Sequence, residues 1–294
     1  MPRFNRTSLF SFAILVIALL AFGGISEAGQ ESPPLNIEAV RQVLKQYSPA
    51  ALTEYIVVRK DKLVSFQSSA LAKPDSSVFK TEDAKRMGMG LLIADGFYCL
   101  AFGKNAEAAK YYEAYYRLSR ELPLRDLANI DMKPSPAMEA FFKDPTKMSD
   151  ADLNKLDQEW NRKVIANLEI LAASTEGIHF AVDLFYAMEI ESIYLVAQSV
   201  IQSDGKSEGA IAALAGEENN IKFVEKLMAA VHTDPSQRIV FEISEKKAFL
   251  TPIVNLLKKK AGKLSKADAK EVLKMVAPER KKIATGILVE KKAK

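Results

Sequence analysis

The sequence predicts an all-α protein, and three observations support this fold class. Apolar residues recur at three- and four-residue spacing along most of the chain, as on one face of a helix. Alternating apolar and polar residues, which are typical of strands, are nearly absent. Residues that cap helices precede several of the periodic segments. We therefore expect a two-part bundle of helices or array of helical hairpins behind a cleaved signal peptide.

Residues 1–28 have the layout of a secretory signal peptide. Arg3 and Arg6 precede an apolar run from Leu9 to Phe22, and the small residues Ser26 and Ala28 follow it. Cleavage is expected after Ala28, with a cut after Gly23 as an alternative. An uncleaved anchor is the rival interpretation, but a spanning helix needs about 20 apolar residues and this run is shorter.

The first helical part is expected over residues 29–122. Helices are predicted behind Asn36 and from Ser48-Pro49. Residues 62–80 are ambiguous: Leu63 to Phe66 could form a strand or continue a helix, whereas Lys73 to Ser77 form a loop. The segment from Glu82 to Gly103 is the most apolar of the mature chain, so we expect a buried central helix there. Its glycines would let neighbouring helices approach closely. A further helix is predicted from Lys104 to Glu121.

A proline-containing connection, residues 123–148, separates the two parts. Prolines recur along it, and Ser135-Pro136 followed by Glu139 predicts one short helix inside it. The second part, residues 149–294, begins with a capping-box pattern from Ser149 to Asp152. Further helices are expected over residues 150–171, 178–202, 208–231 and 235–261, the last broken at Pro252, and from a second capping box at 265–268.

Charge is distributed unevenly along the mature sequence. Residues 29–244 hold 24 lysines and arginines against 31 aspartates and glutamates, whereas residues 245–294 hold 15 against 5. The basic end also contains apolar residues at helical spacing. Three outcomes stay open for it: docking on the acidic body, solvation, or peripheral contact with an anionic surface such as lipid or cell-wall polymer.

One cysteine, Cys99, is present, so an internal disulfide is excluded, and no thiol near the cleavage region could carry a lipid. The stretch from Leu91 to Phe97, followed by a helical hairpin, resembles a group of exported α-helical bacterial proteins with no assigned function. This resemblance implies an exported helical protein and nothing about its chemistry.

Asp95 is the first candidate functional residue. It is the only charged residue between Met87 and Phe102, so a helix would carry it into or beside the core. A buried carboxyl group must be paired, hydrogen-bonded or protonated. Two interpretations stay open: a functional acid in a cleft, or a structural carboxylate that caps a neighbouring helix or pairs with an arginine.

Two further groups of residues are weaker candidates. Glu176, His179 and Asp183 share one helix face, which is half of a carboxylate-bridged metal site, but no second Glu-x-x-His motif completes it. We therefore predict no metal and no cofactor. Four clustered tyrosines are a candidate ligand or partner surface, since adjacent pairs are not expected to face inward together: Tyr111, Tyr112, Tyr115 and Tyr116.

Hydrolase, P-loop and dinucleotide motifs are missing, so no catalytic class is indicated. We expect an exported protein, periplasmic or secreted and not a lipoprotein, that acts as a non-enzymatic binding or scaffold module of the cell envelope. Its expected partner is an envelope protein or cell-surface component, and not nucleic acid. The alternative is a small-ligand binding or catalytic protein with Asp95 in a cleft between the helical halves.

Overall fold

The computed structural model describes residues 42–43, 58, 62–122, 133–147, 149–171, 175–230, 238–260 and 263–288. Over these residues the regular structure is helical and contains no strand, which confirms the all-α class. The described helices belong to one compact unit, Pro33–Lys294. The signal peptide ending at Ala28 and the short helix from Ser48-Pro49 fall outside the described residues, as does most of the helix behind Asn36.

The described chain begins with a segment that we call the strap, residues 62–81, which contains the 3-10 turns η1 (Ser68–Ala70) and η2 (Ser76–Val78). The two helices that follow it, α3 (Glu82–Ala101) and α4 (Asn105–Glu121), form a hairpin. Thr81 caps α3 by accepting a hydrogen bond from the backbone N–H of Ala84. Gly103 supplies the positive φ of 68° that the turn between the helices requires.

The predicted short helix in the connection is present as α5 (Pro136–Lys143), and Ser135 caps it. The turn η3 (Pro145–Lys147) leads to α6 (Asp150–Leu171). Ser149 and Asp152 exchange the reciprocal hydrogen bonds of the predicted capping box. The capping box therefore fixes the start of α6 where the sequence predicts it.

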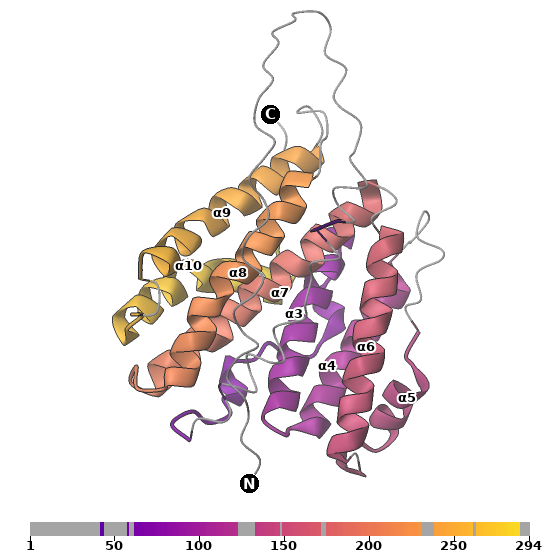
Figure 1. Cartoon of the computed structure of the whole chain (residues 1–294). Helices are drawn as coiled ribbons and strands as arrows, with labels where there is room; N and C mark the ends of the chain where they lie inside the picture. The colour runs from indigo at the N-terminus through magenta and orange to yellow at the C-terminus, as the bar shows by residue number, and fades with distance from the viewer. Residues whose placement is uncertain are drawn as a thin grey trace, which may run out of the picture. The chain divides into compact units, whose positions relative to one another are not determined.

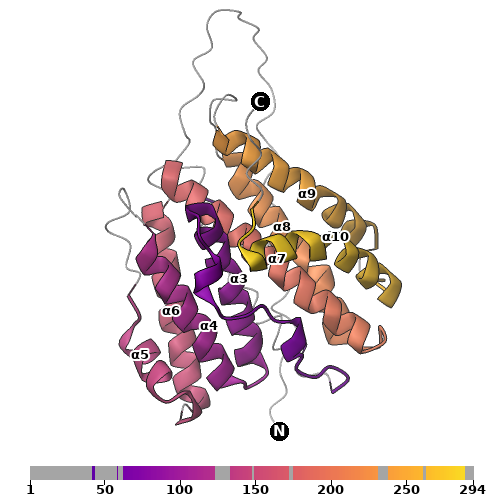
Figure 2. The same ribbon diagram turned by 180° about the vertical axis from the view of Figure 1, so that it is seen from behind.

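The remaining helices follow as α7 (Thr175–Gln202), α8 (Glu208–Ala230), α9 (Arg238–Lys260) and α10 (Lys266–Thr285). α7 is the central element, since it packs against α3, α6, α8, α9 and α10 (Figure 1). The view from behind shows α10 crossing α7, with α8 and α9 on the same side of the bundle (Figure 2). Helices from both predicted parts thus share one core, and the division into two parts stays a prediction.

α3 and α7 approach each other closely in the core. A Cβ atom added at Gly90 would collide with the backbone carbonyl of Leu184 on α7. A larger residue is therefore excluded unless the helices separate. This contact confirms the expectation that a glycine of the central helix lets a neighbour approach closely.

The predicted break at Pro252 is wrong, because α9 continues through this residue. Proline removes one backbone donor from a helix. Leu250 and Ile253, on either side of it, are fully buried, and the Thr251 hydroxyl donates to the carbonyl of Lys247 (2.8 Å). Packing on both sides therefore maintains the helix despite the proline.

The basic end is docked through α10. Its apolar residues Ala269, Val272, Val276 and Ile283 are buried in the core, and the second capping box, Ser265 with Asp268, is present. The apolar side of the predicted amphipathic pattern is thus satisfied within the fold. The described part of the basic end is consequently an integral part of the bundle.

Candidate functional site

The site is built around Asp95, which lies in the middle of α3 and has no exposed surface. Its Oδ2 atom accepts a hydrogen bond from the backbone N–H of Ala72 in the strap (3.1 Å). Glu191 of α7 and Arg280 of α10 act electrostatically on the same carboxyl group. The prediction that α3 carries Asp95 into the core is confirmed.

Burial raises the pKa of Asp95 well above its ordinary value, and the neighbouring carboxylate of Glu191 raises it further, against the opposing effect of Arg280. Asp95 therefore keeps its proton to a higher pH than an exposed aspartate does. The Oδ1 atom has no hydrogen-bond partner among the described residues.

Arg280 binds Glu191 through two hydrogen bonds. Its Nε donates to Oε2 (2.8 Å) and its Nη2 to Oε1 (2.9 Å), a bidentate geometry that fixes the carboxylate in orientation as well as distance. The guanidinium also lies over the ring of Tyr194, 4.6 Å from its centroid. Burial opposes the charge of Arg280, but the carboxylate of Glu191 outweighs it, so the pKa of Arg280 lies above its ordinary value.

The same side chains hold the strap. Arg280 Nη2 donates to the carbonyl of Ala70 (2.8 Å), Asp95 accepts from Ala72, and the Tyr111 hydroxyl of α4 donates to the carbonyl of Ala72 (2.6 Å). We call Asp95, Tyr111, Glu191 and Arg280 the acid clasp. Three of the four reach the backbone of Ala70 or Ala72, so the clasp joins a loop to α3, α4, α7 and α10.

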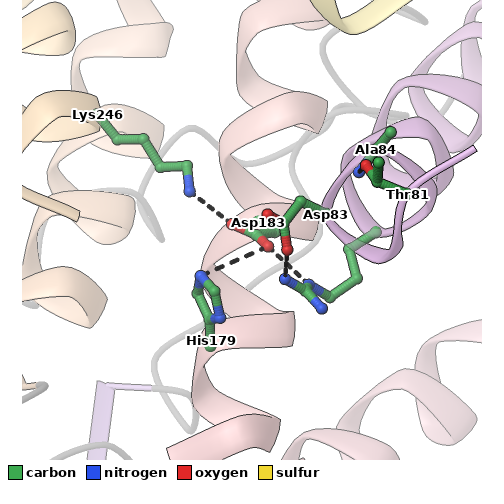
Figure 3. A network of polar contacts seen from close by, with 7 residues as sticks. Thr81, Asp83, Ala84, His179, Asp183 and Lys246 are labelled. Atoms are coloured by element: carbon green, nitrogen blue, oxygen red, sulfur yellow. Dashed lines mark hydrogen bonds and ion pairs between the residues drawn. The ribbon is translucent and has the colours of Figure 1, made fainter. Parts of the chain in front are cut away.

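A second buried cluster, the ion-pair junction, lies further towards the amino terminus of α7 (Figure 3). Asp183 is fully buried and accepts from Arg86 Nε of α3 (2.7 Å) and from Lys246 Nζ of α9 (2.6 Å). His179 Nε2 is 3.7 Å from the Asp183 Oδ2 atom, and Arg86 also pairs with Asp83. The junction therefore ties three helices at one carboxylate.

The pKa of Asp183 is shifted in the opposite direction from that of Asp95. Burial alone would raise the pKa of Asp183, but Lys246, His179 and Arg86 together lower it below its ordinary value. Two buried aspartates on neighbouring helices thus have pKa values shifted in opposite directions, downward for Asp183 among cations and upward for Asp95 beside another carboxylate.

Asp183 was also a candidate metal ligand together with Glu176 and His179. The structure brings His179 and Asp183 near each other, but both Asp183 oxygens accept hydrogen bonds from cationic side chains. The side chain of Glu176 lies outside the described structure. Among the described residues, no group of three histidine, cysteine or carboxylate side chains is arranged to hold a metal ion.

The expectation that the tyrosine cluster exposes part of its surface is wrong. The side chains of Tyr111, Tyr112, Tyr115 and Tyr116 are 1–7 % exposed. Tyr111 points to the strap, and α5 contributes rings that meet two of the others: Phe141 faces Tyr112 and Phe142 faces Tyr116. α5, in the proline-containing connection, therefore covers tyrosine rings that the residue spacing within α4 predicted to be exposed.

Sequence reasoning missed Arg86, Glu191, Lys246 and Arg280. One signal was available, because α7 is apolar on all sides yet carries Asp183, Glu189 and Glu191. A helix buried all round requires partners for such acids. The sequence does not show which of the many lysines and arginines provide them.

Comparisons with protein-family models, with curated proteins and with solved structures found no match. Within the part of the chain that the structure describes, no helix is both long and apolar enough to cross a membrane.

Proposed function

We propose that this protein is an exported, non-enzymatic binding module of the cell envelope, which contacts an anionic surface through a lysine-bearing face of α10. Export is supported by the amino-terminal sequence, with its two arginines, apolar run and small residues before Gly29. The binding role rests on the surface charge of α10.

The observation that carries this proposal is the division of α10 into two faces. Its buried residues occupy one side, and Lys270, Lys274 and Lys281 are exposed on the other, at spacings of four and seven residues. We call these three residues the lysine stripe. Their ammonium groups form no ion pair with described residues, unlike Lys260, which pairs with Asp268 (3.2 Å). An unpaired cationic stripe attracts anionic surfaces at low ionic strength.

Neighbouring lysines extend the positive charge. Lys258, Lys259 and Lys260 are exposed in the last turn of α9, and Lys263 is exposed in the connection to α10. Because Lys260 pairs with Asp268 in the first turn of α10 (3.2 Å), this group of charges lies near the start of the helix that carries the lysine stripe. The basic end thus combines a docked apolar side with an outward cationic side, a form that suits peripheral contact with phosphate- or carboxylate-bearing surfaces.

The alternative is a small-ligand binding or catalytic protein centred on Asp95. One observation favours it, namely that Asp95, Tyr111 and Glu191 converge as a ligand site would require. Ala72 lies directly against the carboxyl group, however, and Asp95 has no exposed surface. The clasp is therefore better explained as a structural device than as a binding site.

Co-sedimentation with lipid vesicles tests the proposal. The mature chain should bind vesicles of phosphatidylglycerol at low salt and be released as ionic strength passes about 0.15 M. Vesicles of phosphatidylcholine should not bind it. Point substitutions are needed rather than deletion of the basic end, since removing α10 would expose core surface that Val272 and Val276 cover.

The informative variant is Lys270→Glu/Lys274→Glu/Lys281→Glu. Its matched control changes three exposed lysines on other helices, Lys110→Glu/Lys155→Glu/Lys226→Glu, with the same change in net charge. The stripe variant should remain in the supernatant while the control still sediments. Equal binding by both variants, or no binding by the unmodified chain at low salt, would overturn the proposed surface.

A further inference from the structure

The acid clasp holds the middle of the strap, and other contacts hold its two ends. Near the start, the N–H of Ser65 donates to Gln202 Oε1 (3.1 Å) and that of Gln67 donates to the Tyr98 hydroxyl (3.2 Å). Near the end, the carbonyl of Val78 lies against Gly286, which follows α10. Between these points, Ala70 and Ala72 are bound by side chains of the clasp.

Several ionisable groups face the Asp95 carboxyl from the elements packed around it. They are Tyr98 and Cys99 on its own helix, Tyr111 on α4, Glu191 on α7, and Arg280 on α10, which in turn contacts Tyr194 of α7. Burial raises the pKa of Tyr98 to about 12 and raises those of the Cys99 thiol and the Tyr111 hydroxyl above their ordinary values. These three groups therefore stay neutral while Asp95 can ionise.

Loss of the Asp95 proton would leave two carboxylates beside one guanidinium. Arg280 already binds both oxygens of Glu191, so a charged Asp95 would be desolvated without a cation of its own. Such a charge is costly in the interior. The structure must then admit water or move a group that covers Asp95.

The strap is the covering element that can move at the lowest cost. By contrast, the backbones of α3 and α7 approach each other closely at Gly90 and Leu184, within a packed core. The strap is a loop with two short 3-10 turns, and three hydrogen bonds from the clasp hold its middle. Local opening of weakly held segments is the usual response to strain of this kind.

We propose that the proton on Asp95 is a latch: while it is bound, the strap stays closed over α3 and α10, and when it leaves, the middle of the strap opens. The protein would thereby respond to pH through a buried aspartate in place of a surface histidine. This inference is independent of the lysine stripe and of any partner.

The sign of the pH effect follows from the two states of Asp95. The carboxyl has a raised pKa in the closed form and returns to its ordinary value when water reaches it. The closed form is therefore fully favoured below the ordinary aspartate pKa, and its advantage is lost as pH rises towards the raised value. Between these limits, the ratio of open to closed strap should rise about tenfold per pH unit.

Hydrogen exchange followed by mass spectrometry, on the full mature chain at pH 6 to pH 9, tests the latch. Rates are divided by the intrinsic chemical rate at each pH, and peptides from α7 provide the internal reference. In the unmodified protein, the corrected exchange of peptides covering residues 70–73 should rise by up to about tenfold per pH unit. In Asp95→Asn, which keeps an acceptor for Ala72 and cannot ionise, it should stay constant.

The matched control is Asp75→Asn, the same change at an exposed position of the strap, and it should keep the pH dependence of the unmodified protein. Flat corrected exchange in the unmodified protein, or an equal slope in Asp95→Asn, would overturn the proposal. Should Asp95→Asn fail to fold, carbon-13 NMR of the Asp95 carboxyl in the unmodified chain decides the question. Strap opening that rises with pH while Asp95 stays ionised throughout would contradict the latch.

Discussion

Glu191 of α7 and Arg280 of α10 are joined in the core by two parallel hydrogen bonds of 2.8 and 2.9 Å. The pair connects the central helix to the basic end of the chain. Because Arg280 also binds the carbonyl of Ala70, the same guanidinium connects both helices to the strap. A single side chain thus joins three parts of the fold that are distant in sequence.

Breaking this pair on one side should be strongly destabilising. Arg280→Gln leaves Glu191 buried beside Asp95 without a cation, and we expect a loss of about 3–5 kcal/mol in the free energy of unfolding. Glu191→Gln removes the carboxylate bound to Arg280 but leaves Asp95 as an acidic neighbour, so it should cost less than Arg280→Gln. The double variant should cost less than the sum, since it leaves no unpaired charge. Urea denaturation of the four proteins measures this coupling, and strictly additive losses would contradict it.

The helix contact at Gly90 predicts a graded pair of substitutions. In Gly90→Ala the new methyl group meets the backbone carbonyl of Leu184, which cannot move without displacing α7. In Gly96→Ala it meets the ring of Tyr112 at 3.0 Å, and a side chain can adjust. We expect Gly90→Ala to cost about 1–3 kcal/mol or more and Gly96→Ala to cost less. Thermal unfolding gives the order, and the reverse order would refute this account of the interface.

The buried carboxylate of Asp183 should make the stability of the folded protein sensitive to acid. Its pKa is lowered in the folded state, so its contribution to stability is present above the ordinary aspartate pKa and is lost as pH falls through the lowered value. Asp183→Asn should lower stability at neutral pH and reduce the loss on acidification. Melting temperatures from pH 7 to pH 3 test this, with Glu113→Gln, at an exposed position of α4, as the control. A parallel pH profile in Asp183→Asn and the unmodified protein would show that this carboxylate does not carry the effect.

Tyr111→Phe removes one hydrogen bond of the acid clasp and leaves the ring in place. The carbonyl of Ala72 loses its donor (2.6 Å), so we expect a loss of about 1 kcal/mol and faster exchange in the strap. Exchange in α7 should be unchanged. If the strap and α7 were affected equally, the hydroxyl would support the whole core and not the strap in particular.

Local signals in the sequence predicted most helix starts correctly. Ser135, Ser149 and Ser265 each accept a backbone hydrogen bond at the start of the helix that follows, as their sequence positions indicated. Such caps involve residues two or three apart, so one segment contains all the information. The prediction of a break at Pro252 was wrong because the burial of Leu250 and Ile253 outweighs the helix-breaking preference of proline. Burial is a property of the whole fold and cannot be read from one segment.

The candidate site was predictable only in part, for a related reason. The isolation of Asp95 in an apolar segment indicated burial, and burial required a partner or a proton. Its neighbours come from α7, α10 and the strap, and nothing in the local pattern links these segments to α3. The prediction that the tyrosines are partly exposed was wrong for the same reason, because α5, a separate segment, covers α4.

The acid clasp and the latch both require Asp95 to be protonated in the folded protein. Carbon-13 NMR of a chain labelled in its aspartate side chains, with Asp95→Asn to assign the signal, measures this property directly. At about pH 6, roughly two units above the ordinary aspartate pKa, the Asp95 carboxyl carbon should have the chemical shift of a protonated acid. A carboxylate shift at that pH, which would mean that Asp95 is already ionised in the core, would contradict both the acid clasp as described and the latch.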